Sequence, residues 1–207
     1  MNMTLRHCCA AICILCLAGA PALADETTDA MKKAQAFYRQ GNLGKAYKQL
    51  EEAAAEIMHR LATLYAKTYP AAPQGWTLPP HKSSAKKSMR GLGRGILLIR
   101  HYRQNAGGGV ATAQMIVDDR GIVAGLIDVL SNPATVKRMK GTWVPIEGGG
   151  KAIVTFNEAR KRGNIRLLVA RRFYITITAR NIESRAFLTS LLSAWDFAGL
   201  KKTGGMN

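Results

Sequence analysis

The sequence predicts an α+β protein: an N-terminal antiparallel helical hairpin, then a meandering antiparallel sheet of five or six strands covered by one or two helices. Helical periodicity fills residues 28–67, and strand-like alternation takes over from Gly95. The clearest strand signal is residues 163–180, where two runs of β-branched, aliphatic and aromatic residues meet at a short turn. Alternate residues of 173–180 share a face, which is typical of a half-buried antiparallel strand.

The first 24 residues have the pattern of a secretory signal peptide. Arg6 precedes an apolar run, and small residues lead up to Ala24, where we expect cleavage. All four cysteines lie within residues 8–16, so the predicted mature chain has no thiolate for catalysis or metal binding. The remaining histidines lack ligand spacing. We therefore expect a periplasmic or secreted protein without a metal or another cofactor.

Residues 25–69 are predicted to form the helical hairpin, which Gly41 and Asn42 divide. The second helix has a continuous apolar stripe at a spacing of three and four, opposite a charged side. The stripe comprises Leu43, Ala46, Tyr47, Leu50, Ala53, Ala54, Ile57, Leu61, Leu64 and Tyr65. Apolar stripes on helices usually form part of a hydrophobic core, so we expect the hairpin to pack on the neighbouring domain. The alternative is that it presents a groove to a partner.

The run FYRQGNLGKAYKQLEEA, residues 37–53, resembles the core of a tetratricopeptide repeat. The resemblance covers about residues 28–58 and gives family roles to Phe37, Tyr38, Gly41, Ala46, Leu50 and Ala53. Two departures stand against a repeat array: no proline closes the second helix near Met58, and the chain has no second copy. The resemblance therefore implies a single hairpin. Its candidate residues for a protein contact are Phe37, Tyr38 and Tyr47.

Residues 70–90 are rich in proline, serine and lysine and are predicted to be a linker before a basic α+β domain at 91–207. Trp76 in this linker could dock onto either domain. Residues 83–86 match the serine–lysine spacing of penicillin-binding enzymes. That motif acts at the start of a buried helix, so its place in a polar linker indicates a chance match.

Further strands are expected at 96–102, 110–117, 143–146 and 151–156. Residues 122–130 fit a strand or a short helix, with their neighbours favouring a helix. Residues 184–195 carry apolar side chains at helical spacing and should cover the dry face of the sheet. This layout is similar to that of the PsbP-like group of extrinsic and periplasmic proteins. The resemblance is one of topology and implies no functional motif.

No catalytic constellation is visible, so we expect a protein that is not an enzyme. The glycine runs 107–109 and 148–150 are not followed by Lys-Ser/Thr and are better explained as hairpin turns. Asp118 and Asp119 are adjacent at a strand end, where neighbouring side chains diverge. The other carboxylates of this domain are isolated in the sequence.

The domain is strongly basic: from Lys82 onward there are 22 Lys and Arg against seven Asp and Glu, a difference of +15. Such a field attracts anions, although it is also compatible with a merely solvated surface. We expect the partner to be an anionic cell-envelope component or an acidic protein, and not a nucleic acid. The positive charge is also compatible with peripheral contact to a membrane. The candidate residues are Lys137, Arg138, Lys140, Arg160, Lys161, Arg162, Arg166, Arg171 and Arg172. The clusters at 160–162 and 171–172 should lie at opposite ends of one hairpin. The alternative is a carrier or chaperone that holds an apolar ligand between the sheet and the C-terminal helix.

Overall fold

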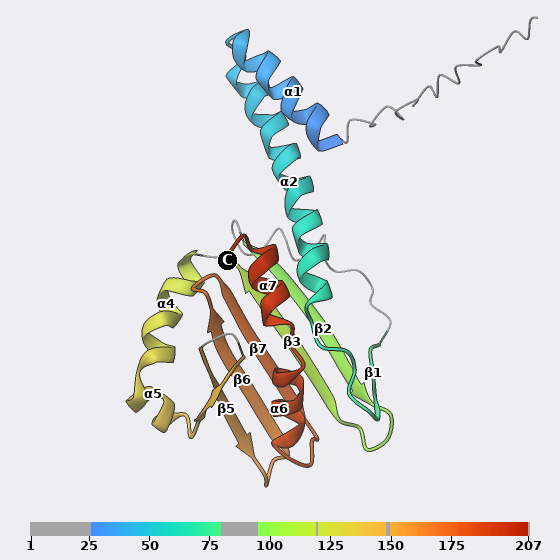
Figure 1. Cartoon of the computed structure of the whole chain (residues 1–207), viewed down its shortest axis with the longest axis vertical. Coiled ribbons are helices and arrows are strands. Elements are labelled where there is room, and N and C mark those ends of the chain that lie inside the picture. The colour runs from blue at the N-terminus through green and yellow to red at the C-terminus, as the bar shows by residue number, and fades with distance from the viewer. Residues whose placement is uncertain (1–25, 80–94, 119, 148–149, 207) are drawn as a thin grey trace, which may run out of the picture. The chain divides into compact units, whose positions relative to one another are not determined.

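The computed structural model describes residues 26–79, 95–118, 120–147 and 150–206, and Figure 1 shows the arrangement of the elements. The predicted signal peptide, the serine–lysine match at 83–86 and the glycine pair 148–149 lie outside the described residues. The chain divides into two compact units, residues 1–53 and 54–207. The boundary between the two units falls inside a helix, after residue 53. The sequence, in contrast, predicted that the hairpin ends near residue 69.

The first unit is the predicted helical hairpin, made by α1 (Glu26–Arg39) and the first part of α2 (Leu43–Lys67). Gly41 has a positive φ of 74° and turns the chain between the helices. The buried side chains of the hairpin are small, and alanines let two helices approach closely. They include Ala30, Ala34, Ala46 and Ala53. The predicted stripe is therefore divided: Ala46 and Ala53 are buried in this unit, whereas Leu43, Tyr47 and Leu50 are exposed.

The second unit contains one antiparallel sheet of seven strands in the order β1-β2-β3-β7-β6-β5-β4. The strands are β1 (Trp76–Thr77), β2 (Ile96–Gln104), β3 (Val110–Val117), β4 (Thr142–Pro145), β5 (Lys151–Asn157), β6 (Arg162–Val169) and β7 (Phe173–Arg180). The α+β class is confirmed. There is one strand more than the upper predicted number, because Trp76 and Thr77 of the predicted linker pair with β2.

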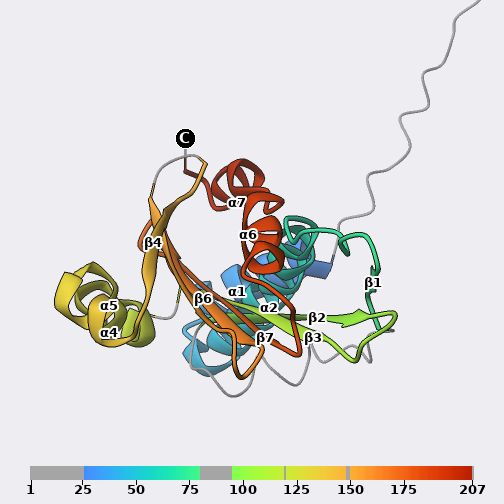
Figure 2. The same ribbon diagram turned by 90° about the horizontal axis from the view of Figure 1, so that it is seen from below.

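The predicted C-terminal helix covers one face of the sheet, as Figure 2 shows. The predicted helix at 184–195 forms as α6 (Ala186–Ser193), and a further short helix, α7 (Phe197–Thr203), follows beyond the predicted range. Asp196 lies between the two helices, and its Oδ1 accepts a hydrogen bond of 2.7 Å from Gly199 N and caps α7. Leu188, Leu191 and Leu200 are fully buried against alternate residues of the central strands.

Tyr65 and Tyr69, which the sequence placed in the hairpin, belong to this core together with the second part of α2. Trp76 also packs here: its ring stacks on Phe187 with centroids 4.0 Å apart and planes at 19°. These aromatic side chains attach residues 65–76 to the core of this unit.

The open question about residues 122–130 is resolved in favour of a helix: α4 spans Arg120–Ser131, and α5 spans Pro133–Arg138. Asn132 caps α5, since its Oδ1 accepts from Ala134 N at 2.9 Å. The two helices cover part of the other sheet face, on the side away from β1 (Figure 2). The apolar cluster beneath them comprises Leu126, Leu130, Val136, Trp143, Ile153, Leu168 and Tyr174.

Candidate anion-binding face

The sheet face opposite α6 and α7 carries rows of side chains that run across the strands, because the antiparallel register is continuous from β2 to β5. The first row is Arg103, Val110, Arg180, Arg162 and Asn157. The second is His101, Thr112, Thr178, Asn164 and Thr155, and the third is Ile99, Gln114, Thr176, Arg166 and Ile153. Neighbours within a row are about 4.8 Å apart from strand to strand, and successive rows are separated by about 6.8 Å.

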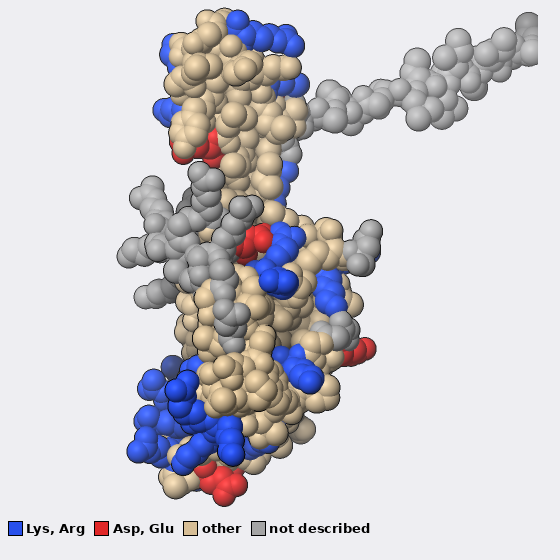
Figure 3. Space-filling view, turned by 90° about the vertical axis from the view of Figure 1, so that its left-hand side faces the viewer, with Lys and Arg blue, Asp and Glu red and all other residues tan. Residues whose placement is uncertain are grey.

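Four arginines dominate these rows, and we call Arg103, Arg162, Arg166 and Arg180 the arginine face. The three in the first row are exposed, and Arg166 is half-buried. None of the seven described strands contains Asp or Glu. Figure 3 shows Lys and Arg side chains gathered at one end of the sheet unit. The strands therefore present positive charge without a carboxylate of their own to neutralise it.

Polar contacts order the second and third rows. Asn164 Nδ2 donates to Thr178 Oγ1 at 3.1 Å, and Asn164 Oδ1 accepts from Arg166 Nε at 3.0 Å. Arg166 Nη1 lies 4.0 Å from Met139 Sδ. Among the described residues, the partners of the Arg166 guanidinium are thus neutral. Burial raises the pKa of the Tyr174 hydroxyl, and the Arg166 charge partly opposes this increase.

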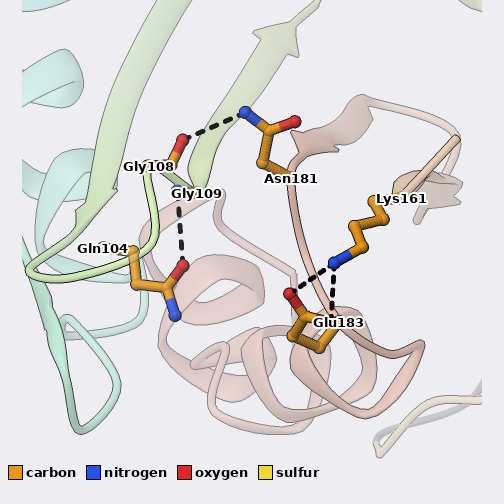
Figure 4. A network of polar contacts seen from close by, with 6 residues as sticks. All are labelled: Gln104, Gly108, Gly109, Lys161, Asn181 and Glu183. Carbon is orange, nitrogen blue, oxygen red and sulfur yellow. Dashed lines mark hydrogen bonds and ion pairs between the residues drawn. The ribbon is translucent and has the colours of Figure 1, made fainter.

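A second set of contacts, drawn in Figure 4, holds the end of the sheet from which the first row projects. Gln104 Oε1 accepts from Gly109 N at 3.3 Å, and Asn181 Nδ2 donates to Gly108 O at 3.3 Å. Lys161 Nζ pairs with the Glu183 carboxylate at 2.9 and 3.0 Å. Gln104, Asn181 and Lys161 are next in the chain to Arg103, Arg180 and Arg162, respectively. The backbone that positions each arginine is therefore tied to a neighbouring turn.

The structure places the predicted anion-binding residues in several regions. Only Arg162 and Arg166 lie on the arginine face. Residues 160–161 and 171–172 lie in the turns at the two ends of β6, as the meander predicted. Lys137, Arg138 and Lys140 are exposed in and after α5.

Arg172 has a structural role. Its Nε and Nη2 each donate to the Asp118 carboxylate at 2.5 Å, and Nη1 donates to the Gly204 carbonyl. The hydrogen bonds to Asp118 raise the pKa of the Arg172 guanidinium. This residue joins the β6–β7 turn to the end of β3 and to the C-terminal segment, so its charge is already paired.

Sequence reasoning missed Arg103 and Arg180 as site residues. The alternation of residues along 173–180 predicts that Arg180 lies on the solvent-exposed face of the strand. This was a signal from which it could have been identified as a site residue. Arg103 joins the site only because β3 pairs with β7, a contact between segments about sixty residues apart in the chain. Nothing local in the sequence indicates that pairing.

The residues predicted for a protein contact differ in exposure. Phe37 is half-buried, and Lys45 Nζ lies 5.5 Å from its ring centroid. Tyr38 is 69% exposed and Tyr47 62% exposed. Leu43 and Leu50 of the same hairpin are also more than half exposed. The hairpin thus presents large apolar side chains on its outer surface.

Within the described residues, no helix combines the length and apolar character needed to cross a membrane. In the same part of the chain, no three His, Cys, Asp or Glu side chains form a group that could hold a metal ion. The chain matches no family model, no curated protein and no solved structure.

Proposed function

We propose that this chain is a non-enzymatic binding or accessory protein of the periplasm, exported by its predicted signal peptide. Its sheet unit binds an anionic partner of the cell envelope through the arginine face, and its helical hairpin contacts a protein. One observation carries the proposal: four arginines share one face of a sheet whose described strands contain no Asp or Glu.

The chemistry of arginine supports this function. A guanidinium is planar and permanently charged, and it donates two parallel hydrogen bonds to a carboxylate, phosphate or sulfate. Three of these guanidinium groups are exposed, so binding an anion does not require the sheet to open. Two other positive charges of this unit, those of Arg172 and Lys161, form ion pairs with Asp118 and Glu183, respectively. Within the described residues, no such carboxylate pairs with the four arginines of the arginine face.

The test is binding to anionic vesicles and anionic polymers across a salt series, using the protein purified after expression of the full chain. We expect retention at low salt that falls as salt rises, because exposed charges are screened over about 10 Å at 0.1 M. The double variant Arg162→Gln/Arg180→Gln should lose most of this retention. Its matched control, Arg138→Gln/Arg171→Gln, removes the same charge elsewhere and should retain binding. Equal losses in both variants would make the effect one of net charge and would contradict a defined face.

The hairpin part of the proposal is supported by Tyr38, Leu43, Tyr47 and Leu50, which expose apolar area that a partner protein could cover. The variant Tyr38→Ser/Leu50→Ser should lose a co-purifying envelope protein while its melting temperature stays the same, since both side chains are more than half exposed. Polyanion binding by the sheet unit should be unaffected. Unchanged co-purification would remove the hairpin from the proposal.

The alternative of an apolar ligand between the sheet and α6 has no observation in its favour. A Cβ atom added at Gly163 of β6 would lie 2.3 Å from Leu188 Cδ1 of α6. At this point Leu188 of α6 packs directly on the strand.

A further inference from the structure

We propose that the anionic partner is an acidic polysaccharide whose chain lies across β2, β3, β7 and β6 along the first row of side chains, which contains Arg103, Arg180 and Arg162. This inference rests on the proposed function and specifies its ligand class.

Three of the arginines form a line across the strands. Arg103 and Arg162 lie in one row, three strand spacings or about 14 Å apart, with Arg180 between them. Arg162 and Arg180 are directly opposite each other, close enough to share one anionic group. Arg103 is two strands from Arg180, so a further anionic group is needed to engage it. A linear polymer with acidic groups at intervals can contact all three at once.

A row of neutral polar side chains runs beside the arginines. About 6.8 Å away, Thr112, Thr178, Asn164 and Thr155 bring hydroxyl and amide groups to the same face. Thr178 Oγ1 accepts from Asn164, which leaves its own hydroxyl hydrogen to be donated. Sugar hydroxyls both donate and accept hydrogen bonds, and so do these side chains. Charges and neutral polar groups in parallel rows match a chain that carries both acidic groups and hydroxyls.

The side chains of this face suit a polysaccharide better than nucleic acid or a membrane surface. Proteins that bind single-stranded nucleic acid stack its bases on exposed aromatic side chains. From β2 to β5, none of the three rows contains Phe, Tyr or Trp. The third row continues to Trp143 of β4, but Trp143 and Tyr174 pack in the cluster beneath α4 and α5. A membrane anchor would need apolar side chains to insert, and in the first row the apolar residue is Val110, 41% exposed. A hydrated acidic chain fits this flat polar face better than either.

The test compares four probes by calorimetry: polygalacturonate oligosaccharides for carboxylate groups, dextran sulfate for sulfate groups, oligo-dT, and phosphatidylglycerol vesicles. We expect one or both polysaccharides to bind most tightly, with affinity that rises with oligosaccharide length until the chain spans the row. Arg103→Gln should lower affinity about tenfold for long oligosaccharides and leave the shortest ones unchanged. Thr178→Val, which changes no charge, should lower it about three- to tenfold with the same salt dependence.

Two matched variants control for the case in which Thr178→Val loses affinity only because it folds poorly. Thr178→Ser retains the hydroxyl and should bind as the wild type does, and Thr142→Val makes the same exchange at an exposed position of β4. Stronger binding of oligo-dT or vesicles than of both polysaccharides would overturn the inference. Vesicle binding that depends on Arg162 and Arg180 would leave the proposed function standing, whereas a preference for oligo-dT would overturn that function as well. Unchanged polysaccharide affinity in Thr178→Val would also overturn it. Failure of all four probes to bind would overturn both.

Discussion

Arg162 on β6 and Arg180 on β7 lie directly opposite each other in the sheet, with both side chains on the open face. Like charges in this relationship repel, and directly opposed like charges destabilise a sheet. No carboxylate of the strands lies between them to reduce the repulsion. The pair therefore costs the fold some stability, as is common at sites where proteins bind a ligand.

We predict that Arg180→Thr stabilises the protein while weakening polyanion binding. The substitution removes the repulsion with Arg162 and places a residue of high strand propensity in β7, which should raise the melting temperature by about 1–2 °C. Arg103→Thr is the matched control, because the residue opposite it is the neutral Val110. Differential scanning calorimetry should show the increase in Arg180→Thr alone. Equal increases in both variants would assign the effect to threonine propensity.

Arg100 supports a different prediction, because it lies on the covered face of the sheet, among apolar side chains. Its Nη2 donates to Ala66 O in the last turn of α2 at 2.8 Å, and Nη1 lies 3.3 Å from Tyr69 O. Its guanidinium carbon is 5.0 Å from the Tyr69 ring centroid. Arg100→Met keeps the apolar stem but leaves these carbonyls without their donor. We expect a loss of about 2 kcal/mol in the free energy of unfolding, measured in urea.

Arg100→Lys provides the control for that experiment. A lysine keeps the charge but lacks the planar fork that reaches several carbonyls at once, so it should recover only part of the loss. Full stability in Arg100→Lys would show that charge alone matters at this position. Full stability in Arg100→Met would show that the capping contacts to α2 contribute little.

Most of the fold could be predicted from the alternation of apolar and polar residues and from the residues typical of turns. They predicted β3 with its observed bounds, and they predicted the β6–β7 pair with its buried and exposed faces, because both signals are local. The same patterns missed β1, since two residues in a proline-rich stretch become a strand only by pairing with β2. Arg100 is an exception to the pattern of β2, because this charged residue lies at a position that faces the core. Its partner is the end of a helix about thirty residues earlier, and tertiary contacts of this kind leave no mark on periodicity.

The candidate site was less accessible to the sequence. Clusters of basic residues drew attention to 160–162 and 171–172, but Arg172 forms an ion pair with Asp118, and Lys161 forms one with Glu183. The arginine face is assembled from single arginines on separate strands. It depends on the strand order and register, which place Arg103 and Arg180 in one row.

Gly163 tests how closely α6 packs on the sheet. An added Cβ would meet Leu188 Cδ1 at 2.3 Å and the Thr155 carbonyl oxygen at 3.0 Å, so the strand has no room for a side chain here. Gly163→Val should lower the free energy of unfolding by about 1–3 kcal/mol through overpacking, and Gly163→Ala by less. Urea denaturation of both variants measures this. A stabilising effect of either substitution would reveal unfilled space between the sheet and α6 and would revive an apolar ligand site.

The stability of the sheet unit should fall in alkaline solution because of a buried tyrosine. Burial raises the pKa of Tyr102 from 10.0 to about 12, and its hydroxyl donates a hydrogen bond of 2.9 Å to Pro70 O. The folded protein keeps this proton to a higher pH than the unfolded chain, so the stabilisation is complete below pH 10 and is lost as pH rises towards 12. Urea midpoints measured from pH 8 to pH 11 should decline less steeply in Tyr102→Phe, which starts from a lower value because it lacks the hydrogen bond. Parallel declines in the two proteins would show that other groups govern alkaline unfolding.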